Sequence, residues 1–173
     1  PVYNFKNLIV GECNKMGFTA GESISNAPGK TAFNPLFLFG GPGLGKTHLS
    51  LAIANVVIDK GFDVYYGSVQ SIMDKLEGEH FGRLPREESI KEDILNCDLL
   101  IIDDLGTEFA TQFTNAEIYN IVNTRILASL PTIISTNLDF NEISEKYSQR
   151  VASRIVGSCD SMYFCGKDIR QMD

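Results

Sequence analysis

The chain has 173 residues, of which 43% are hydrophobic and 21% charged, which is enough for one core and short of two full domains. Its 15 basic and 22 acidic side chains give a net charge of −7, which excludes a general electrostatic affinity for nucleic acid and leaves only local contacts with DNA. The four cysteines show no C-x-x-C spacing, and neither a signal peptide nor an apolar run of about 18 residues is seen, so we expect a reduced, cytoplasmic protein without a membrane partner.

Residues 1–34 are mixed and turn-rich, and the apolar runs that follow them predict five strands. These runs are residues 36–39, 63–67, 99–102, 132–135 and, with a weaker pattern, 161–165. The third and fourth runs are apolar without alternation, which is typical of strands that are buried on both faces of a parallel sheet.

Helical patterns lie between the predicted strands. Thr114 and Glu117 form a capping-box pattern ahead of apolar residues that share one helix face. Asp139 and Glu142 predict the start of a short helix over residues 140–146. Strands that alternate with helices favour right-handed βαβ units and a doubly wound α/β sheet, which binds its ligands at the carboxyl ends of the strands.

Residues 40–47 match the phosphate-loop pattern G-x-x-x-x-G-K-[ST] between a predicted strand and a predicted helix, and that context favours a phosphate site over a glycine-rich turn that binds nothing. The glycines allow backbone N–H groups to face inward, and the helix N-terminus favours phosphate. Lys46 adds a charge for the β- and γ-phosphates, and Thr47 adds a hydroxyl for Mg²⁺. The residues that we expect around the nucleotide are Gly41, Pro42, Gly43, Leu44, Gly45, Lys46, Thr47 and His48.

Two adjacent carboxylates, Asp103 and Asp104, follow the third predicted strand. We assign Asp103 to Mg²⁺, usually through water, and Asp104 to orienting or deprotonating the attacking water. Many ATPases carry Glu at the second position, so the shorter Asp predicts slow hydrolysis. The alternative, a turn or helix-cap carboxylate, is disfavoured because the pair would lie uncompensated near the core.

Polar residues after the fourth strand complete the predicted site. Asn137 is expected to face the space between Lys46 and Asp103 and to bond the γ-phosphate or the water, with a simple strand-end turn as the alternative. Arg150 and Arg154 share one helix face, where a guanidinium group can stabilise transition-state charge on the ATP of a neighbouring chain. Arg170 could contact phosphate in its own chain. A surface salt bridge is the alternative role for each arginine.

Residues 76–93 form a charge-rich stretch, for which a solvated loop and helix face is favoured over a DNA-contacting loop.

In combination, these motifs resemble the AAA+ ATPases of bacterial replication, especially helicase loaders of the DnaC type and the related IstB-like transposition helpers. The matching stretches are Gly43–Asn55, Cys97–Glu108, Phe113–Asn137, Tyr147–Gly157 and Gly166–Gln171. The resemblance implies a P-loop NTPase with a five-stranded parallel sheet of order 5-1-4-3-2, binding of ATP or ADP with Mg²⁺ at Thr47 and Asp103, and sensing by Asn137. It also implies a trans-acting finger at Arg154, through which copies associate, and a second sensor at Arg170.

The N-terminal part resembles a different family. Residues 3–11, together with residues 27–30 ahead of the phosphate loop, look like the replication initiator DnaA, in which the Val-Gly step lies by the adenine. The likeness implies that Val10 and Gly11 line the base pocket. We therefore expect a single AAA+ domain over residues 1–173, with an initiator-like segment (1–34), a loader-like core (35–173), no helicase-binding domain and a reduced or absent lid.

The favoured function is a helicase loader in bacterial DNA replication, in which the ATP state switches binding to a replicative helicase and to single-stranded DNA. Hydrolysis is expected to be slow in an isolated monomer, because the arginine finger arrives only on assembly. The alternatives are a transposition helper, an initiator-like ATPase, a small-molecule kinase and a module that binds ATP without hydrolysing it.

Overall fold

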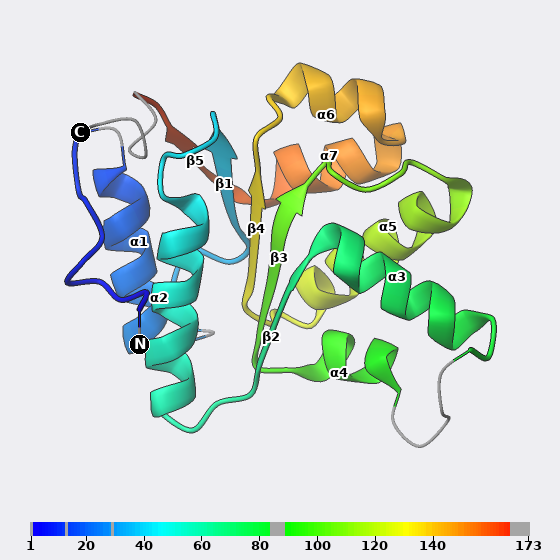
Figure 1. Cartoon of the computed structure of the whole chain (residues 1–173), viewed down its shortest axis with the longest axis horizontal. Coiled ribbons are helices and arrows are strands. Elements are labelled where there is room, and N and C mark those ends of the chain that lie inside the picture. The colour runs from blue at the N-terminus through cyan, green and yellow to red at the C-terminus, as the bar shows by residue number, and fades with distance from the viewer. Residues whose placement is uncertain (1, 13, 29, 84–88, 167–173) are drawn as a thin grey trace.

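Within the described residues (2–12, 14–28, 30–83 and 89–166), the computed structural model contains one parallel sheet of five strands. Their spatial order is β2-β3-β4-β1-β5 (Figure 1), which is the predicted order read from the opposite edge and confirms the AAA+ type of α/β fold. The strands are β1 (Leu36–Gly40), β2 (Val64–Ser68), β3 (Leu99–Leu105), β4 (Thr132–Thr136) and β5 (Asp160–Phe164).

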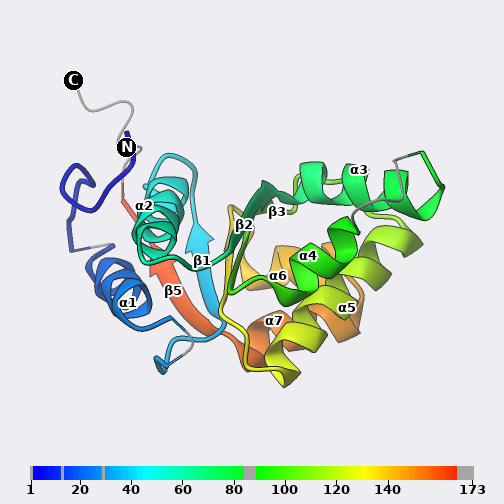
Figure 2. The ribbon, with the colours of Figure 1, turned by 90° about the horizontal axis from the view of Figure 1, so that it is seen from below.

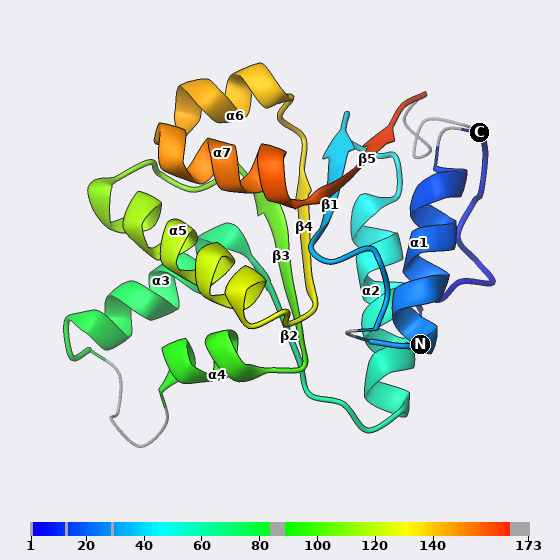
Figure 3. The same ribbon diagram turned by 180° about the vertical axis from the view of Figure 1, so that it is seen from behind.

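Helices cover both faces of the sheet (Figure 2; the reverse view is in Figure 3). One face carries α1 (Lys15–Asn26) and α2 (Lys46–Asp59). The other face carries α3 (Val69–His80), α4 (Ile90–Asn96), α5 (Gln112–Leu127), α6 (Phe140–Lys146) and α7 (Gln149–Ser158).

The central strands are buried on both faces, as their continuous apolar runs predicted. Leu99 and Ile101 of β3 pack in the core beneath α1 and α2, whereas Leu100 and Ile102 pack in the core beneath α3 to α7. Successive side chains of a strand point to opposite faces, so one apolar run supplies both cores.

Arg125, a fully buried side chain, joins α5 to α4 and β4 at the edge of the sheet opposite the strand carboxyl ends. Its Nε donates to Thr132 Oγ1 (2.9 Å), and its terminal nitrogens donate to the carbonyl oxygens of Ile94 (3.0 Å), Leu95 (3.1 Å) and Pro131 (2.7 Å). The last carbonyls of a helix have no partner within it, so the guanidinium group satisfies groups that α4 leaves open.

Two expectations about the helices need correction. The helix predicted to begin at the Thr114 capping box begins at Gln112, with Thr111 as its N-cap. Thr114 is the third residue of the helix, and its buried hydroxyl accepts from the N–H of Thr111 (2.8 Å). The box is therefore one turn earlier than predicted, whereas the box of Asp139 and Glu142 starts α6 as expected.

Residues 15–26 form a helix, α1, within the segment that the sequence analysis described as turn-rich. Two glycines weaken its helical pattern but allow a close approach to its neighbours. A Cβ atom at Gly17 would lie 2.6 Å from the Phe164 ring, and one at Gly21 would lie 2.9 Å from Leu49 Cδ1. Tertiary packing thus outweighs the low intrinsic helix propensity of glycine.

The charge-rich stretch 76–93 includes the end of α3 and the start of α4, and residues 84–88 lie outside the described residues. Leu76 is buried in the core, whereas residues 81–83 are exposed. Among the helices that the structure describes, none combines the length and apolar character needed to cross a membrane.

Candidate nucleotide site

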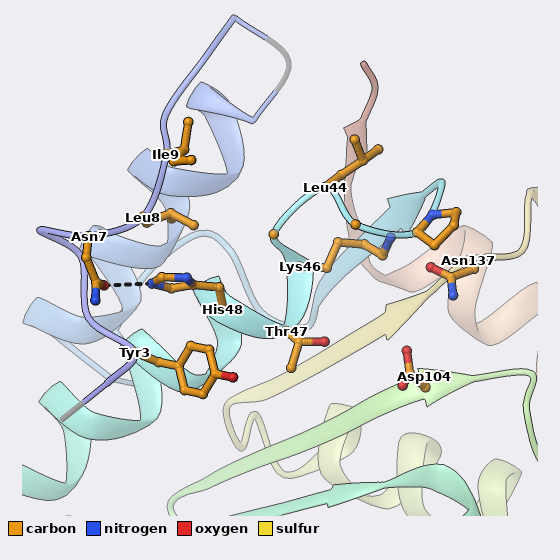
Figure 4. A pocket seen from close by; sticks show the side chains of 13 residues that line it. Tyr3, Asn7, Leu8, Ile9, Leu44, Lys46, Thr47, His48, Asp104 and Asn137 are labelled. Carbon is orange, nitrogen blue, oxygen red and sulfur yellow. Dashed lines mark hydrogen bonds between the residues drawn. The ribbon is translucent and has the colours of Figure 1, made fainter. Parts of the chain in front are cut away.

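A cavity of about 550 Å³ lies where β1, β3 and β4 reach their carboxyl ends. Figure 4 shows its walls: the phosphate loop and the start of α2, the end of β3 with Asp104, Asn137 after β4, and the N-terminal segment. Because β4 lies between β1 and β3, the sheet order brings Asn137 to the same cavity as Lys46. Asn137 was predicted to face the space between Lys46 and Asp103, and Asp104 is the aspartate of this pair that lines the cavity. The strand ends thus converge at the position where doubly wound sheets bind ligands.

The phosphate loop connects β1 to α2. Gly43 (φ 71°) and Gly45 (φ 89°) adopt the left-handed conformation that favours glycine, and Gly45 is the N-cap of α2. The first N–H groups of α2 have no partner within the helix, which leaves donors at this end of the cavity. Pro42, Leu44 and Thr47 line the cavity as well.

Lys46 is only 5% exposed, and its Nζ donates to the carbonyl oxygens of Gly40 (2.7 Å) and Gly41 (2.6 Å). Burial lowers the pKa of Lys46 to about 8, while Asp104 and Asp103 oppose that shift. Because this pKa lies close to neutral pH, an anion in the cavity would stabilise the charged form of Lys46, and phosphate oxygens would accept hydrogen bonds from its ammonium group.

Asp103 and Asp104 lie at the end of β3 but in different surroundings. Asp103 is 3% exposed; its Oδ2 accepts from the Tyr66 hydroxyl (2.7 Å), and its Oδ1 accepts from the Ser135 hydroxyl. Asp104 lines the cavity with a left-handed φ of 55°, at an irregularity in the β3–β4 register. Burial, reinforced by the charge of Asp103, raises the pKa of Asp104, and Lys46 counteracts this.

The N-terminal segment forms the wall opposite the strand ends. His48 Nε2 lies 3.0 Å from the carbonyl oxygen of Asn4 and 2.9 Å from Asn7 Oδ1, and the Tyr3 ring meets the His48 ring edge-on at 5.2 Å between centroids. Asn55 Nδ2 donates to the carbonyl oxygen of Tyr3 (2.7 Å). Helix α2 therefore holds this segment through His48 and Asn55.

Tyr3, Asn7, Leu8 and Ile9 line this wall, and Val10 and Gly11, the predicted base-pocket residues, follow directly after them in the chain. Gly11 takes part in the turn that precedes α1. The N–H of Gly11 donates to Asn14 Oδ1 (2.8 Å), and its carbonyl accepts from the N–H of Asn14 (3.2 Å), which directs residue 11 into the turn. The asparagine spacing at positions 4 and 7 was the signal in the sequence for an ordered segment here, because such side chains bond nearby backbone groups.

Arg150 and Arg154 lie on α7, and neither lines the cavity. The Arg150 guanidinium carbon lies 4.5 Å from the centroid of the Tyr119 ring on α5. Hydrogen bonding with Arg150 and Arg154 lowers the pKa of Tyr119, a half-buried residue, so both arginines lie beside its phenol. Val151 and Ile155 bury the opposite side of the helix, as predicted. Arg170 lies outside the described residues.

Glu108, which the sequence analysis did not single out, links the loop after β3 to the arginine-bearing region. It is 2% exposed; its Oε2 accepts from the N–H of Gly106 (2.9 Å), and its Oε1 accepts from the Tyr147 hydroxyl. Lys146 Nζ donates to the carbonyl oxygen of Glu108 (2.8 Å). Burial and the bond to Glu108 raise the pKa of Tyr147. The loop that follows Asp104 is therefore tied to α6 and the start of α7.

Comparison with known proteins identifies related sequences and related structures. The family model described as the bacterial DnaA ATPase domain matches residues 1–159. The chromosomal replication initiator protein DnaA of Chlorobaculum tepidum is 35% identical over 146 residues, which cover 83% of this chain and 29% of that protein. The chain thus spans about a third of the length of the curated relatives that it matches.

Solved structures of related proteins have the same fold. A replication initiator DnaA bound to AMPPCP and single-stranded DNA superposes with a TM-score of 0.85 at 26% identity, covering 96% of this chain and 51% of that one. The DnaC helicase loader superposes with a TM-score of 0.79 at 20% identity, covering 95% of this chain and 97% of that one, and this likeness concerns the fold alone.

The initiator resemblance, expected only for residues 1–34, extends through most of the chain. It includes the phosphate loop, the carboxylates at the end of β3 and the arginines of α7. By fold, by the position of its cavity and by this continuous match, the chain belongs to the bacterial DnaA ATPase domain family.

Proposed function

We propose that this protein binds and hydrolyses ATP and acts as an AAA+ switch in the initiation of bacterial DNA replication. The observation that carries the proposal is the convergence of Lys46, Asp104 and Asn137 on one cavity at the strand carboxyl ends. A triphosphate in this cavity would meet the α2 N-terminus and the Lys46 ammonium. The AMPPCP in the related initiator structure supports a nucleotide as the ligand.

The residues present fit a magnesium ion. Thr47 offers a hydroxyl in the cavity, and the buried Asp103 offers a carboxylate whose two oxygens each accept from a hydroxyl. Oxygen donors of this kind suit Mg²⁺, which keeps several of its waters. When bound, the ion would neutralise charge on the β- and γ-phosphate oxygens.

The remaining roles follow from position. Lys46 would exchange its two loop carbonyl acceptors for phosphate oxygens. Asp104 would orient the attacking water or accept its proton, and its raised pKa brings it closer to the range in which a carboxylate acts as a base. Asn137 would hydrogen-bond the γ-phosphate or that water without adding charge.

Arg154 would act on the nucleotide of a neighbouring copy. It lies on α7, outside the cavity of its own chain, and an arginine supplied by a second chain stabilises charge on the transferred phosphoryl group. Self-association through this surface would then control hydrolysis, so a dilute monomer would turn over slowly.

Family membership favours an initiator-like role, in which the ATP-bound protein would engage single-stranded DNA. The related initiator structure, which is bound to AMPPCP and single-stranded DNA, supports this role. Loading of a replicative helicase is a second candidate, because the stretches Cys97–Glu108 and Phe113–Asn137 resemble the loader sequences. In either role the protein would act in the cytoplasm, and ATP could drive release of a partner only by binding the free and partner-bound states with different affinities.

ATP turnover measured across a range of protein concentrations tests the proposal. We expect the rate per subunit to rise steeply with concentration and to respond to single-stranded DNA. The Lys46→Ala variant should be inactive, and Lys15→Ala, which alters an exposed lysine on α1, should match the wild type. A rate per subunit that is independent of concentration and insensitive to Lys46→Ala would overturn the proposal.

A further inference from the structure

Tyr66, on the edge strand β2, contacts the carboxylate that we assign to magnesium. Its hydroxyl donates to Asp103 Oδ2 at 2.7 Å, although the residue as a whole is 39% exposed. Strand register explains the contact. Tyr66 pairs with Ile101, and Asp103 lies two residues further along β3, on the same face of the sheet. Diagonal neighbours at this spacing are within reach of a long aromatic side chain.

The opposite side of the same carboxylate is held by β4. The Ser135 hydroxyl donates to Asp103 Oδ1 and accepts from the N–H of Asp104 (3.1 Å). Ser135 is fully buried, so it has a fixed position between the two aspartates. Hydroxyls from both adjacent strands therefore clamp Asp103, one on each oxygen.

The two hydroxyl contacts leave the Asp103 carboxylate able to accept further hydrogen bonds. A carboxylate offers about four lone-pair positions, and the two hydroxyls use one on each oxygen. The remaining positions have a fixed direction, because rotation of the carboxylate would break both bonds. The Asp103 side chain is thus already ordered in the folded protein, so ligand binding does not carry the entropic cost of ordering it.

We propose that Tyr66 is a positioning residue for magnesium: it orients Asp103 so that this carboxylate receives the waters of a nucleotide-bound Mg²⁺. The inference rests on the proposed nucleotide site and adds to it a residue outside the phosphate loop and outside the cavity wall.

The test compares Tyr66→Phe with the wild type in ADP binding, measured by calorimetry in EDTA and across a Mg²⁺ titration. The substitution keeps the ring and removes only the hydroxyl. We expect equal ADP affinity in EDTA and a Mg²⁺ requirement about tenfold higher in the variant, the usual effect of losing an outer partner of a metal ligand. A purely structural defect would weaken binding in EDTA as well.

Tyr65→Phe is the matched control, since Tyr65 adjoins Tyr66 in β2 but packs against the other core, beneath α3 to α7. Its Mg²⁺ requirement should equal that of the wild type. In the Asp103→Asn background, adding Tyr66→Phe should have no further effect on the Mg²⁺ requirement. Thermal unfolding without ligand checks that each variant is folded.

The outcomes separate the two proposals. If the wild type binds no ADP with or without Mg²⁺, the proposed nucleotide site itself fails. If it binds ADP equally well with and without Mg²⁺, the assignment of Asp103 to magnesium fails, and the role of Tyr66 fails with it. If the wild type responds to Mg²⁺ and Tyr66→Phe responds identically, the role of Tyr66 is overturned while the site stands. A lower Mg²⁺ requirement in Tyr66→Phe would also overturn it, because the hydroxyl would then compete with the ion.

Discussion

The nucleotide cavity and the surface of α7 differ in how complete they are within one chain. Around the cavity, the phosphate loop, the strand ends and the N-terminal segment already converge, and hydrogen bonds orient Asp103, Lys46 and His48. On α7, Arg150 and Arg154 lie beside Tyr119 and outside the cavity. This difference is the basis of our proposal that one chain would hold a nucleotide, whereas fast hydrolysis would need a second chain.

The difference between the cavity and the α7 surface is tested most strongly by mixing two variants, one with a defective cavity and one with a defective α7 surface. We expect Arg154→Ala to reduce assembly-dependent hydrolysis by about 10³-fold, the scale of an arginine finger, with unchanged ATP affinity. Lys46→Ala should be inactive for lack of nucleotide. A mixture of the two variants should regain activity, because the Lys46→Ala subunit supplies Arg154 to a neighbour that binds ATP. Turnover of the mixture no higher than the sum of the separate variants would contradict action between chains.

Asp104→Asn tests the chemical role of the cavity alone. The left-handed φ of 55° at this position suits Asn, so the fold should persist. We expect hydrolysis to fall by about 10²-fold or more, because the general base is lost, while equilibrium ATP binding remains. Asp160→Asn, at an exposed position of β5, serves as the control. Hydrolysis at the wild-type rate in Asp104→Asn would remove Asp104 from the mechanism.

The link between the two regions can be weakened at Tyr147. Tyr147→Phe leaves the buried Glu108 without one of its donors, which should lower the free energy of unfolding by about 2 kcal/mol in a urea titration. Tyr163→Phe, at a residue that is 61% exposed, should change it by less than about 0.5 kcal/mol. Equal stability of Tyr147→Phe and the wild type would show that this buried contact contributes nothing.

The smallest expected effect is on pH dependence. Lys46 has a pKa of about 8 in the free protein, so it is charged below that pH and increasingly neutral above it. If bound phosphate keeps Lys46 charged, ADP affinity is greatest below pH 8 and falls as pH rises through that value. The decrease between pH 7 and pH 9 should be about tenfold. Lys46→Met should lack this step, and a flat profile in the wild type would contradict the assignment.

Local patterns predicted much of this fold and part of the site. The phosphate loop, the buried third and fourth strands and the Asp139–Glu142 capping box are visible in short stretches of sequence, and each lies where it was expected. The position of Asn137 beside Lys46 required the strand order in addition, which the family resemblance implied, and Asp104 lines the cavity where Asp103 was expected.

What the sequence could not reveal depends on contacts between distant residues. α1 was missed because its glycines matter only for packing against Phe164 and Leu49. Tyr66 and Glu108 look like ordinary surface or loop residues until strand register and loop path bring them to Asp103 and Tyr147. Val10 and Gly11 directly follow the last lining residue of the N-terminal segment, Ile9, where the turn that starts α1 redirects the chain.

The central claim is that the triphosphate tail of a nucleotide and its Mg²⁺ are held by Lys46, Thr47 and Asp103. Its most direct test is equilibrium binding of ATP in the presence of Mg²⁺ to the wild type and to Lys46→Ala, with Lys15→Ala as the control. We expect one nucleotide per chain in the wild type and in Lys15→Ala, and binding at least about hundredfold weaker in Lys46→Ala. No measurable binding to the wild type, or equal binding to Lys46→Ala, would contradict the claim.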